Sequence, residues 1–348
     1  TTVDEARRRY GLDRIVKLSS NENPLGTSPR ATAALRGIDS LSAYADDSQR
    51  ALRGALAAAA GCESDQIILG HGSNELVSYL CSVFLDPDDE AVMALPSFTL
   101  YAKYAHVRGA RIVEVPLRDG VHDLAAMAAA VTARTKIVFV CDPNNPTGTW
   151  IEAHDWKPFL TALPPSVLLV IDQAYVEYGG GLATQMIPSA LERPNTIVLR
   201  TMSKIYGLAA VRFGYGIAHA DVIAWLQRVR IPFNVSGPAA IAVGAAIGDT
   251  EFVERSIANN RQGKAYLLPA LSRLGLQVYP TAANFLAVRV PVGADEAYVD
   301  LMKRGVIVRS GDGLRLPGYL RVTIGTPDEN RAFIEALEPS LSMWKARA

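Results

Sequence analysis

One lysine, Lys204, lies in a stretch whose other side chains are suited to binding a phosphate. The stretch runs from Arg200 to Arg212 and reads RTMSKIYGLAAVR. A lysine amine can form a Schiff base with an aldehyde, whereas hydroxyl and guanidinium groups are good ligands for a dianionic phosphate. The hydroxyls belong to Thr201 and Ser203, and an arginine stands at each end of the stretch. These residue types predict a site for a small molecule that carries both an aldehyde and a phosphate.

The elements that must position this lysine are predicted by an alternation of apolar and amphipathic segments between Asp46 and His219. Short apolar runs rich in Val and Ile are typical of strands that are covered on both faces, and their alternation with helices favours a mostly parallel α/β sheet. The predicted strands are Gln66–Leu69, Ala91–Leu95, Arg111–Val115, Lys136–Cys141, Val167–Ile171, Thr196–Leu199 and Phe213–Ala218. The predicted helices between them are Ser48–Ala60, Asn74–Phe84, Leu100–Arg108, Asp123–Val131 and Asp155–Leu163.

After Pro232 the pattern becomes that of a smaller α+β domain. A helix rich in small residues is predicted from Gly237, and a longer one over Glu251–Leu274. They precede strand-like segments at Gln277–Tyr279, Phe285–Val290, Val306–Arg309 and Leu320–Ile324 and a last helix at Asp328–Ala336. We expect residues 31–236 to form the large domain, and residues 1–30 together with 237–348 to form the small one.

The residues that follow each strand are the candidates for ligand binding, because ligands of an open parallel sheet bind beyond the carboxyl ends of its strands. Gly72, Ser73 and Asn74 follow the first strand and open a helix, an arrangement that can bind a phosphate. Phe98 follows the second strand and can stack on a flat ring. Each feature alone also fits an ordinary turn, a helix cap or core packing, and their shared position at strand ends favours a common site.

Two further strand ends carry groups that suit a heteroaromatic ring. Asn145 lies in the turn Pro143–Gly148, which two prolines make rigid, and its amide can donate to a phenolate-like oxygen. Asp172 ends a buried strand, where a carboxylate needs a partner such as a protonated pyridine nitrogen. Tyr175 can donate to the same ring oxygen. Pyridoxal 5'-phosphate (PLP) carries the aldehyde, the phosphate, the phenolic oxygen and the pyridine nitrogen, and it is the expected cofactor.

The composition of the 348 residues argues against several other classes of protein. Lys+Arg and Asp+Glu both number 35, so no charge excess points to nucleic acid or an anionic membrane surface. No apolar run reaches the ~18 residues of a membrane span, and no secretory signal opens the chain. The three cysteines, Cys62, Cys81 and Cys141, are expected to be free thiols, and the scattered histidines predict no metal site. A cytoplasmic location is expected.

With these motifs the chain resembles the fold-type I PLP enzymes and, among them, the class I/II aminotransferases. The markers are Pro143–Gly148 (PNNPTG), Asp172–Tyr175 and the pair Ser203-Lys204. Three further segments, Lys17–Gly26, Pro232–Ser236 and Leu320–Gly325, look like those of the histidinol-phosphate aminotransferase family. The resemblance runs over nearly the whole chain. Gln173, Asp142 and Ala45 depart from the family pattern, which usually has Glu, Asn and Pro at these positions.

The resemblance implies a role for each candidate residue. Lys204 would join the cofactor aldehyde and move the proton, Asp172 would keep the pyridine nitrogen protonated, and Tyr175 would bind the ring oxygen. The implied cofactor ligands are Gly72, Ser73, Asn74, Phe98, Asn145, Asp172, Tyr175, Thr201, Ser203, Lys204 and Arg212, with Tyr44 reaching in from the partner of a homodimer. The implied substrate ligands are Asn21, Asn145, Arg321 for a carboxylate and Arg309 for a distal phosphate.

The activity that the resemblance implies is a ping-pong transfer of an amino group between L-histidinol phosphate and 2-oxoglutarate. Two alternatives stay open, an aminotransferase for aromatic amino acids and a PLP-dependent amino-acid phosphate decarboxylase. A nicotinamide oxidoreductase is disfavoured because Gly70-x-Gly72 lacks the third glycine of the dinucleotide-binding motif.

Overall fold

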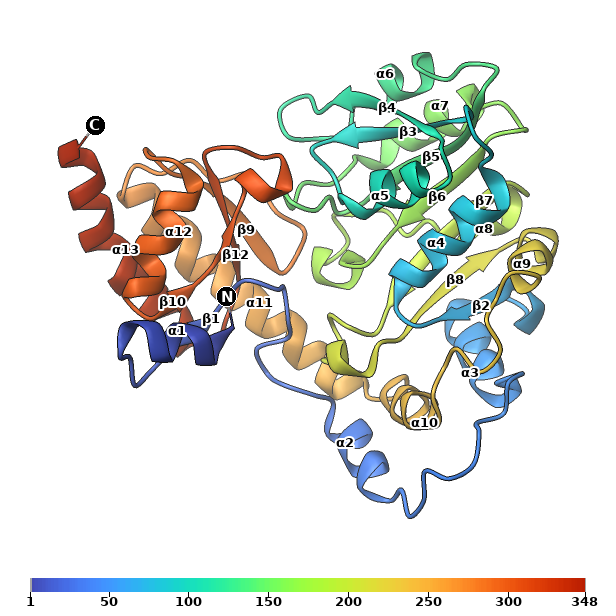
Figure 1. Cartoon of the computed structure of the whole chain (residues 1–348), viewed down its shortest axis with the longest axis horizontal. Helices are drawn as coiled ribbons and strands as arrows, with labels where there is room; N and C mark the ends of the chain where they lie inside the picture. Colours follow the sequence, from blue (N-terminus) through green and yellow to red (C-terminus); the bar gives the residue numbers. More distant parts are fainter. Residues whose placement is uncertain (1, 348) are drawn as a thin grey trace.

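The computed structural model describes residues 2–347, which form a larger and a smaller unit (Figure 1). The larger unit is built around a seven-stranded sheet with the order β2-β8-β7-β6-β5-β3-β4. Strand β8 runs antiparallel to both of its neighbours, and the other neighbouring pairs are parallel. The predicted mostly parallel, seven-stranded α/β sheet is therefore confirmed.

The strands lie close to their predicted positions. They are β2 (Ile67–Gly70), β3 (Glu90–Leu95), β4 (Arg111–Pro116), β5 (Thr135–Cys141), β6 (Leu168–Asp172), β7 (Thr196–Thr201) and β8 (Gly214–Ala218). Every residue of β6 and β7 is buried, as expected of central strands with helices on both faces. Their apolar runs were readable from the sequence because a strand buried on both faces has no polar alternation.

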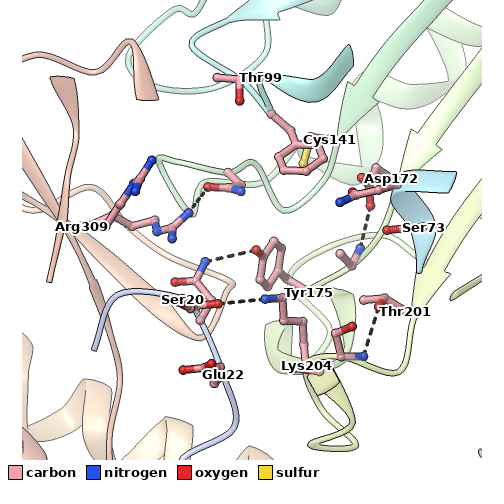
Figure 2. A pocket seen from close by; sticks show the side chains of 18 of the residues that line it. Ser20, Glu22, Ser73, Thr99, Cys141, Asp172, Tyr175, Thr201, Lys204 and Arg309 are labelled. Carbon is pink, nitrogen blue, oxygen red and sulfur yellow. Dashed lines mark hydrogen bonds between the residues drawn. The ribbon is translucent and has the colours of Figure 1, made fainter. Parts of the chain in front are cut away.

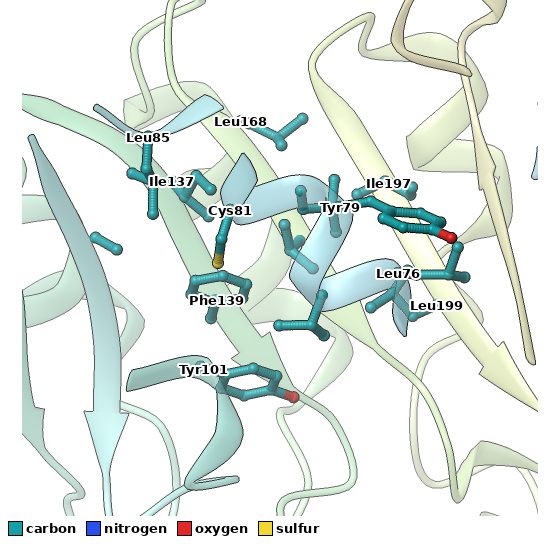
Figure 3. Packing of buried hydrophobic residues seen from close by; sticks show 14 of the residues in the cluster. Leu76, Tyr79, Cys81, Leu85, Tyr101, Ile137, Phe139, Leu168, Ile197 and Leu199 are labelled. Atoms are coloured by element: carbon teal, nitrogen blue, oxygen red, sulfur yellow. The ribbon is translucent and has the colours of Figure 1, made fainter. Parts of the chain in front are cut away.

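Helices cover the two faces of this sheet, and alternate residues of a strand pack on opposite sides. They are α2 (Pro29–Arg36), α3 (Arg50–Ala60), α4 (Ser73–Phe84), α5 (Leu100–Val107), α6 (Leu124–Ala129), α7 (Ala153–Ala162), α8 (Ile187–Glu192) and α9 (Ala220–Gln227), with 3-10 turns η1 (Ser64–Gln66), η2 (Val176–Gly179) and η3 (Ala209–Val211). In β5, Phe139 packs with α4, α5 and α9 (Figure 3), whereas Val138 packs with α6, α7 and α8.

The smaller unit has its own sheet and core. The antiparallel strands β11 (Arg309–Ser310), β12 (Tyr319–Thr323) and β9 (Phe285–Arg289) lie in that order, and β1 (Val16–Lys17) pairs in parallel with β10 (Val306–Ile307). The helices are α1 (Val3–Tyr10), α11 (Thr250–Arg273), α12 (Ala294–Lys303) and α13 (Pro327–Arg347), with the 3-10 turn η4 (Asp312–Leu314). The predicted strand at Gln277–Tyr279 is wrong, because Val278 forms only an isolated bridge with Val288.

The N-terminal segment passes from the small unit to the large one. Figure 1 shows α1 beside the small unit and α2 beside α10 (Gly237–Ala246), beneath the large sheet. Buried residues of α10, such as Ala242, share a hydrophobic cluster with Ala31 of α2 and Ile67 of β2. Helix α10 thus packs against the large unit, and the predicted domain boundary at residues 236 and 237 stays a prediction.

Asp142, which follows β5, is fully buried beneath the end of the sheet. Its Oδ1 accepts a hydrogen bond from the backbone N of Ile151 at 3.0 Å, and its Oδ2 has no partner among residues 2–347. Burial raises the pKa of this carboxyl to about 7, because the low-dielectric interior disfavours the charged form. The folded protein therefore binds this proton more tightly than the unfolded chain does.

Asp142→Asn should stabilise the protein at pH 8 relative to the unmodified chain, and less so at pH 5. The folded pKa of Asp142 lies above the unfolded value, so its contribution to the free energy of unfolding falls as pH rises from about 4 to about 7, by up to about 4 kcal/mol. Urea midpoints at both pH values would measure this, with the exposed Asp13→Asn as control. A stability difference that is independent of pH would contradict the prediction.

Candidate active site

A pocket of about 470 Å³ lies at the carboxyl ends of the central strands, where the small unit faces the large one. Figure 2 shows its lining side chains. The structure brings thirteen of the predicted site residues together there: Asn21, Ser73, Asn74, Phe98, Asn145, Asp172, Tyr175, Thr201, Ser203, Lys204, Arg212, Arg309 and Arg321. The volume is that of a site for a small molecule.

The Lys204 side chain points into this pocket, and its amine is hydrogen-bonded to a backbone carbonyl rather than to a carboxylate. Its Nζ donates to the carbonyl oxygen of Ser20 at 3.0 Å and lies 5.7 Å from the centroid of the Tyr175 ring (Figure 2). Burial, followed by the nearby Arg321 charge, lowers the pKa of the amine to about 8. A neutral amine is a nucleophile and a base, so this lysine is prepared for either role.

Asp172 is the last residue of β6 and presents a buried carboxylate to the pocket. Its register partner on β5 is Cys141, which also lines the pocket. Burial raises the pKa of Asp172, whereas hydrogen bonds from Tyr101 and from the backbone of Ala174 lower it. A cation bound beside this carboxylate would be stabilised by an interaction that solvent screens little.

The turn after β5 is fixed by buried contacts that leave Asn145 facing the pocket. The Asn144 side chain is fully buried and accepts a hydrogen bond from Ser97 Oγ at 2.9 Å, which ties this turn to the one after β3. Gly148 has a φ of 82°, and a Cβ there would lie 2.3 Å from Oγ1 of Thr281. A larger residue at position 148 is therefore excluded, as the motif suggested.

Two arginines from the small unit form the opposite wall. Arg309 and Arg321 are register partners on β11 and β12, and both line the pocket. Arg321 is 8% exposed and donates to Asn145 Oδ1 and to the carbonyl oxygen of Ser19, each at 2.8 Å. Arg309 is exposed. Paired guanidinium groups at one end of a pocket favour an anionic group of the ligand.

A cradle for an anion lies where α4 begins. Gly72 precedes the helix with a φ of 77°, and a Cβ on it would lie 2.5 Å from Nη2 of Arg212. Nη1 of Arg212 donates to Ser203 Oγ at 3.4 Å, and the hydroxyl of Thr201 accepts from the backbone of Ser203 at 3.1 Å. Ser73 is the first residue of the helix, so its N–H end faces the same space.

Tyr175 has one hydrogen-bond partner that leaves its proton free to be donated. Asn21 Nδ2 donates to the Tyr175 hydroxyl at 3.1 Å, so the phenol acts as the acceptor in that bond. Burial raises the pKa of Tyr175 to about 12, which keeps the hydroxyl protonated at neutral pH. Asn21 is itself buried and held by Thr323, which accepts from its backbone N at 2.9 Å.

Gln173 departs from the family pattern. Its side-chain amide forms hydrogen bonds with two different backbone groups. Its Nε2 donates to the carbonyl oxygen of Thr184 at 2.7 Å, and its Oε1 accepts from the backbone N of Met186 at 3.2 Å. A carboxylate could accept but not donate. Glutamine is therefore the residue type that satisfies both groups in this buried position.

Several pocket residues were not predicted, and two of them contact the site through backbone atoms, which sequence patterns do not reveal. Ser19 and Ser20 contribute backbone carbonyls, which any residue type possesses. Both lie directly before Asn21 in the segment Lys17–Gly26, which is the one signal that pointed to them. The other unpredicted lining residues are Glu22, Ser97, Thr99, Cys141, Ala174, Ala209 and Leu314.

Tyr44 lies away from this pocket. It is 84% exposed and stacks on Phe233 with ring centroids 4.6 Å apart. Both rings line a separate surface cavity between the segment that follows α2 and the start of α10. The predicted role of Tyr44 concerns the site of a partner subunit, and it stays a prediction.

Residues 2–347 contain neither a candidate metal site nor a candidate membrane span. No three or more His, Cys, Asp or Glu side chains gather in a way that could hold a metal ion. None of the helices in this part of the chain combines the length and the apolar character needed to cross a bilayer.

Nearly the whole chain matches one protein family. Residues 13–337 fit the family model described as aminotransferase class I and II. The chain belongs to this family. The aminotransferase is 42% identical over 338 residues to the histidinol-phosphate aminotransferase of Brevibacillus brevis, covering 97% of this chain and 93% of the relative. It is 44% identical over 346 residues to that of Moorella thermoacetica, covering 98% and 89%.

A solved structure has the same fold as the aminotransferase. The crystal structure of histidinol-phosphate aminotransferase from Sinorhizobium meliloti in complex with pyridoxal-5'-phosphate superposes with a TM-score of 0.91. The sequence identity is 27%, and the superposition covers 100% of this chain and 95% of that chain. The fold-type I architecture expected from the strand-end motifs is confirmed.

Proposed function

We propose that this aminotransferase binds PLP and transfers an amino group between L-histidinol phosphate and 2-oxoglutarate. The observation that carries the proposal is the convergence of Lys204, Asp172 and the anion cradle around Arg212 in one pocket. The names of the relatives at 42% and 44% identity support the substrate. The paired arginines at the other end of the pocket suit substrates with anionic groups.

The residues present fit the cofactor. Gly72 has no Cβ, and the space that this leaves adjoins the Arg212 guanidinium. A space beside this positive charge suits a dianionic phosphate. The buried carboxylate of Asp172, with its pKa raised by burial, would be stabilised by a protonated pyridine nitrogen. The Tyr175 hydroxyl and the Asn145 amide can donate to a ring oxygen. When bound, PLP supplies an aldehyde that accepts an amino group and a ring that accepts the electron pair left on the substrate α-carbon.

Lys204 is the group in this pocket that moves the proton. With a pKa of about 8, roughly one amine in four is neutral at pH 7.5, compared with about one in a thousand for a lysine with the ordinary value. The neutral Nζ would remove the proton from the substrate α-carbon and deliver it to the carbon that carried the aldehyde, on the other side of the amino nitrogen. The carbonyl of Ser20 holds Nζ over the Tyr175 ring, so the amine stays in the pocket between these transfers.

Arg321 and Arg309 orient the substrate. Arg321 is fixed by Asn145 and by the Ser19 carbonyl, which places its guanidinium against the pocket with little freedom to move. We propose that it binds the carboxylate of 2-oxoglutarate and that Arg309, on the neighbouring strand, adds the second charge that the phosphate of L-histidinol phosphate requires.

We also propose that two copies of the chain assemble through the apolar patch formed by Leu41, Tyr44, Phe233 and Ile241. All four side chains are more than one third exposed, which is costly for apolar groups that no partner covers. The resemblance implies that Tyr44 reaches into the site of a partner subunit. All four side chains line one surface cavity, and a contact between two copies of the chain would cover them.

Lys204→Ala tests the proposed function. The variant should lose the visible absorbance of the cofactor-bound protein, because the aldehyde has no lysine amine with which to condense. Its turnover should fall by at least about 10²–10⁴, the usual contribution of a general base. Absorbance spectra and an assay with L-histidinol phosphate and 2-oxoglutarate measure both effects.

Lys264→Met is the matched control for that variant. Lys264 is also a partly buried lysine whose pKa burial lowers to about 8, but it lies on α11, outside the pocket, and donates to the Thr281 carbonyl. Its replacement should leave the visible band and turnover unchanged. Normal transamination by Lys204→Ala would refute the proposed function.

Arg309→Ala separates the two amino donors that the sequence left open. Loss of a charge-assisted hydrogen bond to phosphate should lower kcat/KM for L-histidinol phosphate by about 10- to 150-fold, equivalent to about 1.5–3 kcal/mol. Activity with L-phenylalanine should change much less, because that donor has no distal anion. Arg289→Ala, an exposed arginine on β9 of the same sheet, is the control. Equal losses with both donors would exclude Arg309 as a phosphate ligand.

Mixing two deficient variants tests the predicted role of Tyr44. Tyr44→Ala and Lys204→Ala should each be poorly active alone, whereas a subunit mixture of the two should recover about a quarter of full activity. In half of the random dimers, one site then combines an intact Lys204 with the partner's intact tyrosine. Activity of the mixture that equals the average of the separate variants would show that Tyr44 does not act across an interface.

A further inference from the structure

The Asp172 carboxylate is held by hydrogen bonds from two different directions. Its Oδ1 accepts from the backbone N of Ala174 at 3.2 Å, within its own loop. Its Oδ2 accepts from the Tyr101 hydroxyl at 2.8 Å. Tyr101 belongs to α5 and is 71 residues away in the sequence. With one donor on each oxygen, the plane of the carboxyl group is fixed.

The Tyr101 ring is held in place by packing in the core. The residue is fully buried, and its ring stacks on Phe139 with centroids 4.7 Å apart and an interplanar angle of 3°. Phe98 packs edge-on against it at 5.4 Å. Figure 3 shows Tyr101 next to Phe139 in the core beneath the site. A phenylalanine would fill the same space, so the hydroxyl is needed for something other than packing.

The hydrogen bond from the Tyr101 hydroxyl affects the pKa of the Asp172 carboxyl group. Burial raises the pKa of Asp172, and the largest opposing effect is the Tyr101 hydrogen bond, followed by the backbone N of Ala174 and the charge of Lys204. Other titratable groups that act on the pair or on its neighbours include Cys141 and Asp142 at the end of β5 and Tyr175 on the loop after β6. Lys204 is the cation that acts directly on Asp172, and Arg321 and Arg212 act in turn on Lys204.

We propose that Tyr101 is a positioning residue whose hydroxyl holds the Asp172 carboxylate ionised and in the orientation that binds the ring nitrogen of the cofactor. This inference rests on the proposed function, because it assigns Asp172 to that nitrogen. The competing interpretation is that Asp172 merely satisfies a buried hydroxyl. That interpretation predicts a loss of stability on removal of the hydroxyl and no effect that depends on the ring nitrogen.

Tyr101→Phe tests the proposal through two forms of the cofactor. One is PLP, and the other is its 1-deaza analogue, in which carbon replaces the ring nitrogen. Dialysis of the loaded protein should show that the variant binds PLP about tenfold more weakly than the unmodified chain does, as expected for loss of a hydrogen bond to a charged group. The affinity for the 1-deaza analogue should change by less than about twofold, because that ring has no nitrogen for Asp172 to bind.

Two further measurements distinguish positioning from structural support. The apparent pKa of the visible band of the PLP-bound protein should shift in Tyr101→Phe, and kcat should fall more than KM rises. The urea midpoint should stay within the range of Tyr104→Phe, the matched control, which removes a hydroxyl from a partly buried tyrosine on the same helix. Adding Tyr101→Phe to Asp172→Asn should have no further effect on PLP affinity.

Three outcomes would contradict the proposed role of Tyr101. Equal weakening for PLP and the 1-deaza analogue would overturn the proposal, and so would a variant that no longer folds, because either result makes the hydroxyl a structural requirement. Unchanged affinity for both ligands would overturn it as well. Failure of the proposed function is a separate result, since the unmodified chain would then neither bind PLP nor develop the visible band.

Discussion

The segment from Ser19 to Asn21 is the constraint on which the site depends, because it is bonded to both units at once. The Ser20 carbonyl accepts from Lys204 of the large unit, and the Ser19 carbonyl accepts from Arg321 of the small one. Asn21 donates its side chain to Tyr175 and its backbone N to Thr323. Carbonyl dipoles satisfy both side chains without adding a negative charge, so Arg321 keeps its charge for a ligand and the pKa of Lys204 stays low enough for its amine to act as a base. An acidic partner in either place would have removed the electrostatic attraction that the pocket offers.

The balance of charge within the pocket follows from this arrangement. Four basic residues line it, Lys204, Arg212, Arg309 and Arg321, against two acidic ones, Glu22 and Asp172. The whole chain has a formal net charge of zero, so the excess is local. Field lines concentrate in a cleft with low-dielectric walls, which favours entry of phosphorylated and carboxylated molecules. The same excess lowers the pKa of Lys204, since Arg321 and Arg212 both add to the effect of burial. Binding of anions and activation of the base thus have one electrostatic origin.

The parts of the site that lie directly after strands could be predicted from the sequence, and the parts that depend on packing between distant elements could not. Apolar runs located β5 and β6, and the position of ligands in parallel sheets then led to Asn145 and Asp172. Ser203 was predicted from its place beside Lys204. Tyr101 gave no such signal, because a buried tyrosine in an amphipathic helix is ordinary core until the fold brings it to Asp172. The strand predicted over Gln277–Tyr279 was wrong for a related reason. Its pairing with β9 is limited to one bridge at Val278, with one backbone hydrogen bond on each side of it, at Gln277 and at Tyr279.

Asp142 and Asp172 lie at the ends of neighbouring strands, but only Asp172 presents its carboxyl group to the pocket. Both carboxyls are buried at strand ends, Asp142 beyond β5 and Asp172 on β6. Asp172 receives a hydrogen bond on each oxygen and opens onto the pocket, whereas Asp142 receives one and leaves Oδ2 unpaired in the interior. Burial without a partner on Oδ2 favours the neutral acid at Asp142. The two carboxyls are both buried and differ in their hydrogen bonds, and only the one that is hydrogen-bonded on both oxygens lines the pocket.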